Sequence, residues 1–314
     1  VTSCYQAEVE SGVITSLVFN GRELVKTAFG TPIVAEDVPF IYDNWDIDAD
    51  YKLKERQVDC LTTQAVVNCD RLVVLRSEFR LTENSTLLRE FDNKLIFADK
   101  HTLARTYFDT TLFAEHYRTE TQFGTVERNA LPHGVADAAR FEVCSHKWTD
   151  LSEKNVGISL LSDSKYGVSV EGGKIGLTLH KSGTHPDARG DNGTSRFRYA
   201  VLPHVNGIGM ETVQAGYDFN LRPILTNRQN LSAPFVVNGD ETVVTETVKQ
   251  GEDGGVAIRL YECLGATATV TVTSNKYKRI ALCNLLEDEE CVLSNEGHAT
   301  ITFSPYKIVT LVLR

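Results

Sequence analysis

The densest group of chemically active side chains lies in the segment EVCSHKWTD, residues 142–150. It places the Trp148 indole beside the His146 imidazole and a lysine, with acidic residues at both ends. A Trp ring can stack on the apolar face of a sugar while polar neighbours bind the hydroxyl groups. The alternative, which we favour, is that Trp148 packs in a core or a domain joint, because aromatic side chains most often serve packing.

A second group, LLSDSKYG at residues 160–167, carries Asp163, Lys165 and Tyr166. Strand alternation predicts that Asp163 and Lys165 point to one face, where the cation can hold a sugar hydroxyl or a carboxylate of another domain. The alternative is a solvated ion pair at a strand end. We expect these three residues to cluster with the loop at residues 44–46 on one edge of a sandwich.

That loop, YDNWDIDADY at residues 42–51, contains Trp45 and Asp46 among alternating acidic residues. The alternation would suit calcium, but the stretch lacks the Gly and the closing Glu of an EF-hand loop. We therefore expect no metal here and an acidic, aromatic loop that faces another domain.

Glu127 and Arg128 end the segment FGTVER, residues 123–128. Such neighbours can form a local ion pair, and an Arg can also donate two hydrogen bonds to a carboxylate of another domain. We expect that Glu127 and Arg128 serve an interface with another domain.

None of the eight histidines forms an HxH or HExxH pair typical of metal ligands.

The block from Gln122 to Gly167 resembles the C-terminal region of the cytosolic-type α-mannosidases of glycoside hydrolase family 38. There, FG.VER, ARFEVC.HKW.DLSE and LL.D.KYG occur in the same order. VPFIYDNWDID at residues 38–48 looks like the family's P..WDAWDVD, and YAVLPH at residues 199–204 looks like its YALLPH. The likeness continues through RLYECLG at residues 259–265 to the closing PYKIVTLVLR. One departure is clear: between Arg128 and Ala139 the family carries a Thr-His-Asn-Thr-Ser-Trp type run, which this chain lacks.

The resemblance implies the C-terminal β region of an enzyme that hydrolyses α-linked mannose in glycans or oligosaccharides. In that family the nucleophile, the acid and the zinc ligands come from the N-terminal catalytic domain, so no catalytic residue, metal or cofactor is expected in this chain and zinc is expected in the missing domain. The implied partners are that catalytic domain and a mannose-containing glycan. The chain would brace the catalytic domain, line its active site and be inactive alone.

Composition and charge limit the remaining classes of partner and cellular location. The net charge is −10 with no block of Lys and Arg, so nucleic acid is not an expected partner. No apolar run approaches the roughly 20 residues of a membrane span, so we expect no membrane contact and a soluble, cytoplasmic protein. The first residues lack a secretory pattern, which suggests that the chain begins inside a longer product. The seven cysteines form no CxxC pair, and we expect free, mostly buried thiols.

Alternation with a period of two predicts strands at VITSLVF from Val13, at residues 65–81, at KIGLTLH from Lys174 and at ATVTVT from Ala268. The fold class expected is all-β. The alternation lapses from Pro223 to Asn238, which places a domain boundary near Ser232 and divides the chain into residues 1–232 and 233–314. The resemblance implies the same layout, a large antiparallel super-sandwich like that of galactose mutarotase followed by a small terminal β sandwich.

Two other functions remain open. A free-standing, non-catalytic carbohydrate-binding module would present Trp45 or Trp148 at its surface. An aldose epimerase would need a His and a Glu facing each other across a cleft, and no pair in the sequence stands out for that role.

Overall fold

The structure is a computed structural model that describes residues 5–69, 72–225, 227, 232–251 and 254–314. Its contacts form two compact units. Unit 1 comprises Val1–Thr119 and Glu127–Asn220, and unit 2 comprises Glu120–Val126 and Leu221–Arg314. The short segment Glu120–Val126 is thus grouped with the C-terminal part of the chain. The expected domain boundary near Ser232 stays a prediction.

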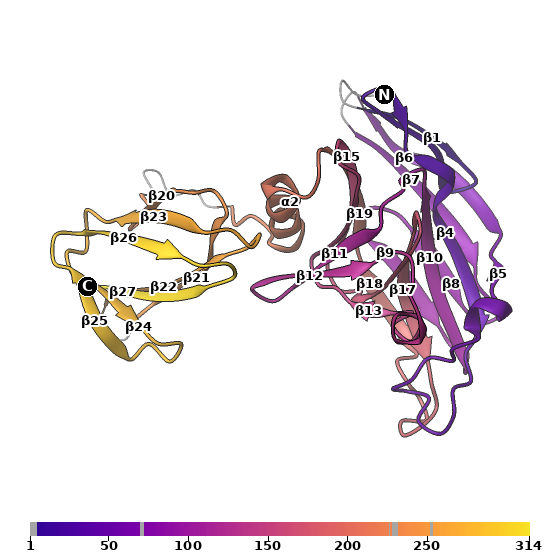
Figure 1. Ribbon diagram of the computed structural model, residues 1–314. Coiled ribbons are helices and arrows are strands. Elements are labelled where there is room, and N and C mark those ends of the chain that lie inside the picture. The colour runs from indigo at the N-terminus through magenta and orange to yellow at the C-terminus, as the bar shows by residue number, and fades with distance from the viewer. Residues whose placement is uncertain (1–4, 70–71, 226, 228–231, 252–253) are drawn as a thin grey trace. The chain divides into compact units, whose positions relative to one another are not determined.

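Most of the described elements are strands, and every strand pair whose register is described is antiparallel, which confirms the all-β class (Figure 1). The long alternating stretch at residues 65–81 belongs to two strands, β6 and β7, that pair with each other. The described helical elements are η1 (Tyr51–Lys54), α1 (Val135–Ala138) and α2 (Met210–Asn220). None of the described helices is long and apolar enough to cross a membrane.

Three sheets contain the strands of unit 1, and the order of strands within each sheet differs from their order in the sequence. The nine-stranded sheet contains β1 (Tyr5–Glu10), β2 (Val13–Phe19), β4 (Val25–Glu36), β10 (Thr102–Thr110), β17 (Lys174–Ser182), β16 (Gly167–Glu171) and β13 (Val143–Cys144), with β3 (Arg22–Glu23) beside β2 and β5 (Arg56–Gln57) beside β4. A five-stranded sheet contains β12 (Gly124–Asn129), β11 (His116–Thr121), β14 (Trp148–Ser152), β15 (Val156–Ser162) and β19 (Tyr199–Val205). Another contains β18 (Gly193–Phe197), β9 (Asn93–Phe97), β8 (Thr86–Arg89), β7 (Leu72–Arg80) and β6 (Cys60–Cys69).

The three sheets share one apolar core. Each contributes fully buried side chains, such as Phe29 from the nine-stranded sheet, Leu87 from β8 and Ile158 from β15. Burying these side chains together removes an apolar face of each sheet from water.

Unit 2 is a two-layered sandwich, as Figure 1 shows. One sheet contains β20 (Val236–Gly239), β23 (Ala268–Thr273) and β26 (His298–Phe303), and the other contains β21 (Val243–Gln250), β22 (Val256–Glu262), β27 (Ile308–Leu313), β24 (Ile280–Cys283) and β25 (Glu289–Ser294). Both sheets contribute to its core, for example through Val270 and Leu311.

The six described cysteines are free, as expected, and Cys4 lies outside the described residues. The expectation that most are buried is wrong. Cys263 and Cys283 are buried, whereas Cys69, Cys144 and Cys291 are exposed, because each of those three belongs to a strand with a solvent-facing side.

Candidate functional site

The strand order of unit 1 brings two long loops to one edge of the nine-stranded sheet. β4 and β17 both pair antiparallel with β10, so their C-terminal ends lie together at the start of β10. In the strand register, Thr102 at the start of β10 lies opposite both Glu36 and Ser182. Residues 37–50 leave β4 and residues 183–192 leave β17 at this edge, and His101 enters β10 there. We call these three segments the aromatic edge.

Asp43 joins the two loops of the aromatic edge. The residue is 3% exposed, and its carboxylate accepts hydrogen bonds from the backbone N–H groups of Thr184 (2.8 and 2.9 Å) and His185 (2.6 Å) and from the Thr184 hydroxyl (3.1 Å). His101 Nδ1 lies 3.1 Å from the same carboxylate. Burial by itself raises the pKa of Asp43, but the hydrogen bonds from His185 and Thr184 outweigh it and the pKa lies below its ordinary value.

A second buried contact reinforces this junction. Lys181 Nζ lies 3.0 Å from a carboxylate oxygen of Asp37, and it also donates to the carbonyl of Asp43. Gly183 permits the close approach, because a Cβ atom there would lie 2.3 Å from the Asn44 side-chain oxygen. The loops are therefore fixed to each other by buried polar bonds.

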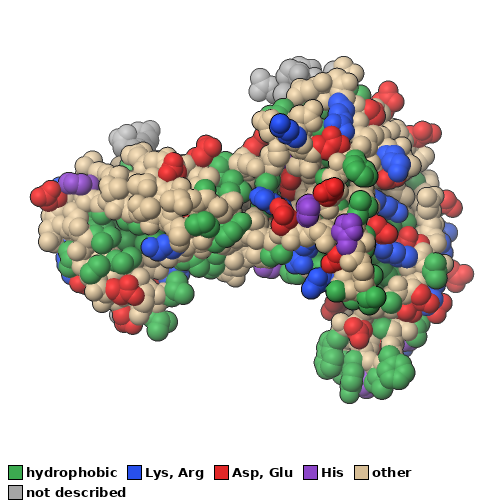
Figure 2. All heavy atoms as spheres, viewed as in Figure 1, with side chains coloured by type: hydrophobic (Ala, Val, Ile, Leu, Met, Phe, Trp, Pro, Cys, Tyr) green, Lys and Arg blue, Asp and Glu red, His purple; other side chains and the backbone are tan. Residues whose placement is uncertain are grey.

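The fixed loops hold a group of exposed aromatic side chains. Trp45 is 72% exposed and stacks on Tyr42 with ring centroids 5.0 Å apart, and Tyr42 lies 5.6 Å from the His185 ring. Phe40 and Ile41 are exposed beside them. In Figure 1 both loops leave the same sheet edge, and Figure 2 shows hydrophobic side chains gathered there. Asp46 is also exposed, so the surface offers ring faces beside a carboxylate.

The structure brings His146 and Tyr166 together. Their rings meet edge to face at 5.4 Å, and Ser145 N–H donates to the Tyr166 carbonyl. Lys165 Nζ lies 4.8 Å from the centre of the Phe197 ring, and burial lowers the pKa of this amine, an effect that Asp191 opposes. Asp191 belongs to the loop 183–192, and Asn44 bonds the Asp187 carbonyl of that loop at 3.0 Å. Asn44 thus contacts this loop, and the charge of Asp191 in the loop acts on Lys165; a joint role of the two segments in binding stays a prediction.

The expectation that Asp163 and Lys165 share a strand face is wrong. β15 ends at Ser162, whose hydroxyl accepts a hydrogen bond from Lys165 N–H and turns the chain. Asp163 therefore lies in the turn, where it pairs with Arg198 at 3.0 Å.

Trp148 is 2% exposed in β14 and lies against Gly216 of α2, where a Cβ atom would be 2.8 Å from the indole. Its ring is not available to a sugar, in agreement with the packing alternative.

Glu127 and Arg128 take separate partners in the described structure. Glu127 pairs with Arg118 of the neighbouring strand at 3.0 Å, and Arg128 Nε lies 3.4 Å from the Thr119 hydroxyl. Successive strand residues point to opposite faces, which explains why the two do not pair with each other. Their interface role stays a prediction.

A buried polar cluster beneath α2 has the residue types of a hydrolase but not the access. His204 Nε2 lies 2.7 Å from the Asp150 carboxylate, and Ser152 and Ser159 both donate to that carboxylate. Desolvation lowers the pKa of His204, but the bond to Asp150 outweighs it and the pKa is raised. Because His204 is 2% exposed and both hydroxyls face Asp150, the cluster is suited to holding β14, β15 and β19 together.

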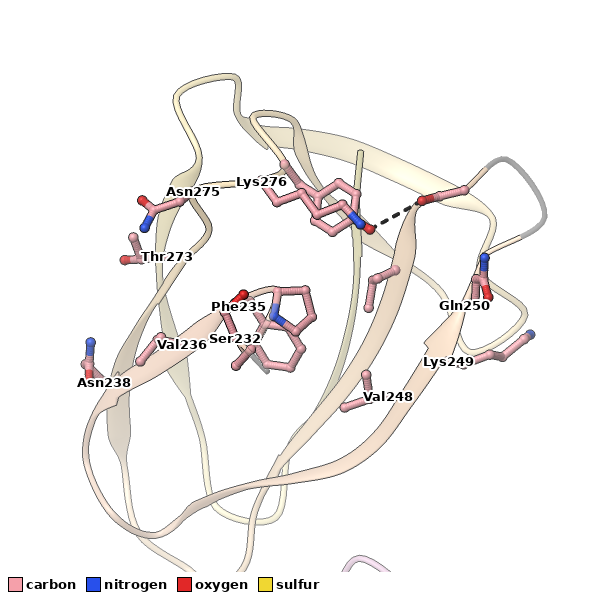
Figure 3. Close-up of a pocket in the computed structure, with 15 residues that line it drawn as sticks. Ser232, Phe235, Val236, Asn238, Val248, Lys249, Gln250, Thr273, Asn275 and Lys276 are labelled. Atoms are coloured by element: carbon pink, nitrogen blue, oxygen red, sulfur yellow. Dashed lines mark hydrogen bonds between the residues drawn. The ribbon is translucent and has the colours of Figure 1, made fainter. Parts of the chain in front are cut away.

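Unit 2 contains a cavity of about 800 Å³ at residues 232–277, shown in Figure 3. Phe235 and Val248 face its middle, while amide and lysine side chains such as Asn238 and Lys249 surround it. Its described lining includes no carboxylate or imidazole, and Lys276 Nζ lies 4.8 Å over the Tyr277 ring. Its described lining therefore offers no pair of carboxyl groups for glycoside hydrolysis.

Over the residues that the structure describes, no cluster of three or more His, Cys, Asp or Glu side chains could hold a metal ion. Two acidic residues of the aromatic edge have other partners: Asp43 faces backbone amides and Asp48 pairs with Lys54 at 2.7 Å. These two carboxylates do not fit a zinc site.

The sequence analysis did not identify Asp37, His101, Lys181 and Thr184, because only the pairing of distant strands brings them within reach of one another or of Asp43. The signal that could have found them is the position of each at or next to the end of a strand.

Comparisons with known proteins agree with this architecture. Residues 2–189 match the model of the glycosyl hydrolases family 38 C-terminal domain, and residues 242–311 match that of the family 38 C-terminal beta sandwich domain. The crystal structure of an alpha-mannosidase from Enterococcus faecalis superposes with a TM-score of 0.77 at 12% identity, over 100% of this chain and 42% of that one. At this identity the likeness shows the fold alone.

Curated relatives are closer in sequence. Alpha-mannosidase G of Dictyostelium discoideum is 34% identical over 70% of this chain and 22% of its own length. Human alpha-mannosidase 2C1 is 32% identical over 96% of this chain and 32% of its own length, and an alpha-mannosidase of Saccharomyces cerevisiae is 27% identical over 88% and 30%. The chain thus spans a third or less of the length of these relatives. It belongs to glycosyl hydrolase family 38, and it corresponds to that family's C-terminal region.

Proposed function

We propose that this chain is the C-terminal β region of an α-mannosidase that hydrolyses α-linked mannose in glycans or oligosaccharides. We further propose that the aromatic edge lines the sugar site of a catalytic domain in the same polypeptide and braces that domain. The observation that supports this best is the stacked pair Trp45 and Tyr42, exposed on loops that the buried Asp43 fixes. Aromatic faces suit the C–H faces of sugars, and a fixed loop loses little entropy when a ligand binds.

The first expected result concerns Trp45 in the intact enzyme. Trp45→Ala should lower kcat/KM for an aryl α-mannoside by roughly 10-fold, the effect of losing about 1.4 kcal/mol of stacking. Phe113→Ala is the matched control, because Phe113 is 71% exposed, nearly the same as Trp45, and belongs to another loop of unit 1. Lys165→Met, assayed in parallel, tests whether the half-buried ammonium group contributes. Equal kinetics for the Trp45 and Phe113 variants would show that the aromatic edge does not serve the sugar site.

A second candidate function is a non-catalytic carbohydrate-binding module, which the exposure of Trp45 also favours. The purified chain discriminates the two. A module would bind mannan or oligomannose without other domains, and Trp45→Ala would abolish that binding. A wall of a larger site would show weak or no binding by itself, with the effect of Trp45 confined to the intact enzyme.

The chain alone should not hydrolyse an aryl α-mannoside, with or without added zinc. A retaining glycosidase needs two accessible carboxyl groups roughly 5 Å apart, whereas Asp37 and Asp43 of the aromatic edge are 1% and 3% exposed and are held by their partners. Release of the aryl group should be followed beside a mock purification from the same host. Turnover above the mock level would contradict the proposal that catalysis requires the other domain.

A further inference from the structure

Unit 1 contains a second cavity of about 800 Å³ outside the aromatic edge. It lies between β1, β2, β4 and β10 of the nine-stranded sheet, β8 and β19. Its wall is mainly apolar and includes Ile14, Leu17, Phe29, Phe108 and Val201. This volume is within the range of pockets that bind small organic molecules.

Arg89, the last residue of β8, lines this apolar cavity. Its Nη1 donates to the Gly12 carbonyl at 2.8 Å, whereas its Nε and Nη2 are buried without a hydrogen-bond partner. Among the described residues, no carboxylate lies within ion-pair distance of Arg89. The Tyr199 hydroxyl, from a residue that also lines the cavity, is likewise buried without a partner. Leaving charged donors unpaired in an apolar wall costs several kcal/mol, so these atoms call for an anion.

The fold holds the guanidinium in place. Its central carbon lies 4.9 Å from the centre of the Phe79 ring and 5.9 Å from that of Tyr199, which is the geometry of a cation–π contact. Gly30, at φ +82°, provides space for the guanidinium group, because a Cβ atom there would be 3.1 Å from Arg89 Nη1. Arg89 is thus packed in a definite orientation.

We propose that this cavity binds a small amphipathic anion, a monocarboxylate with an apolar body. The unpaired Nε and Nη2 form one edge of the guanidinium, and that edge matches the two oxygens of a carboxylate in a bidentate pair. The Tyr199 hydroxyl is the further donor, and the apolar wall takes the hydrocarbon part. Glu211, the one acidic residue of the described lining, is exposed and disfavours a second negative charge on the ligand.

The probes are decanoate, decan-1-ol and decyltrimethylammonium, titrated calorimetrically into the purified chain. We expect decanoate to bind at least 10-fold more tightly than the alcohol and the cation, because they share its apolar body and lack its charge. Arg89→Gln should reduce decanoate affinity to that of the alcohol. Arg196→Gln is the control, since Arg196 is exposed on β18 and the change in charge is the same.

A second variant separates loss of the site from loss of the fold. Ala7 lines the cavity from the edge strand β1 and is exposed, so Ala7→Trp fills the space without a change in the core. It should abolish binding of decanoate and decanol while the Tm stays near that of the unmodified chain. Equal affinity for decanoate and decanol, no binding of decanoate, or unchanged binding in the Ala7 variant would overturn the proposal.

Discussion

Asp43→Asn should release the two loops of the aromatic edge. The carboxylate accepts from Thr184 and His185 N–H and from the Thr184 hydroxyl, and an amide keeps one acceptor while directing its NH₂ group at the same donors. Hydrogen bonds to a charged group are worth about 1.5–3 kcal/mol each. We expect the loss of about 3 kcal/mol of loop stability, seen as a roughly 100-fold faster hydrogen exchange in residues 37–50 and 183–192. In the intact enzyme, kcat/KM should fall by a similar factor if the edge lines the sugar site.

Asp59→Asn is the control for Asp43, because Asp59 is exposed in the same unit and undergoes the same chemical change. The pH dependence gives a further check. The pKa of Asp43 in the folded protein lies below its ordinary value of 3.8, so its contribution is fully present above that value and is lost as the pH falls through the folded pKa. The Asn variant should lack this acid-induced loosening. Unchanged exchange in both loops would mean that Asp43 does not hold them.

The sequence was informative about the fold because strand alternation is a local property. Val13–Phe19 and Ala268–Thr273 are strands with the expected bounds, since their pattern follows from one buried and one solvated face. The division of residues 65–81 between β6 and β7 was not predicted, because strand-like residues such as Val66, Val67, Val73 and Val74 occur on both sides of the point where β6 ends at Cys69.

The candidate site was harder to predict than the fold. Trp45 is exposed and Trp148 is buried although both occur among acidic residues, because Trp45 belongs to a loop whereas Trp148 belongs to β14 and packs against α2. Likewise, nothing local marks Lys181 as a partner of Asp37, because the two are 144 positions apart in the sequence and β10 brings them together. Residues that act through pairing of distant strands carry little signal in a single sequence.

Contacts between segments that are distant in the sequence also account for two motifs of the chain, FGTVER and RLYECLG. Phe123 has a positive φ of 61° at a hairpin turn, and its ring meets that of Tyr261 at 5.5 Å within unit 2. The Tyr306 hydroxyl lies 3.1 Å from that of Thr125, and a Cβ atom at Gly124 would lie 3.1 Å from the Tyr306 ring. Glu262, next to Tyr261 in sequence, accepts from Tyr306 N–H at 3.0 Å. Phe123–Thr125 of the first motif and Tyr261 and Glu262 of the second therefore belong to one packed cluster of unit 2.

Glu262→Gln should destabilise unit 2 more than any surface substitution there. Glu262 is fully buried, and its carboxylate also accepts from the N–H groups of Leu264 (3.0 Å) and Gly265 (2.8 Å). Burial raises its pKa, but these backbone hydrogen bonds outweigh burial and the pKa is lowered. A glutamine leaves one acceptor and places an NH₂ group against N–H donors, so we expect a loss of about 2–4 kcal/mol. This loss of stability is measured by urea unfolding, with hydrogen exchange in β22 and β27 as the probe.

Glu290→Gln, exposed in β25 of the same unit, is the matched control and should change stability by less than about 0.5 kcal/mol. The lowered pKa of Glu262 gives the sign of the pH effect: its contribution is present above the ordinary value of 4.5 and disappears as the pH falls through the folded pKa. The stability difference between the unmodified chain and the Glu262 variant should therefore shrink in acid. Because Tyr306 contacts the hairpin tip, exchange in Glu120–Val126 should also accelerate in that variant. A difference that is small or independent of pH would contradict the role assigned to this carboxylate.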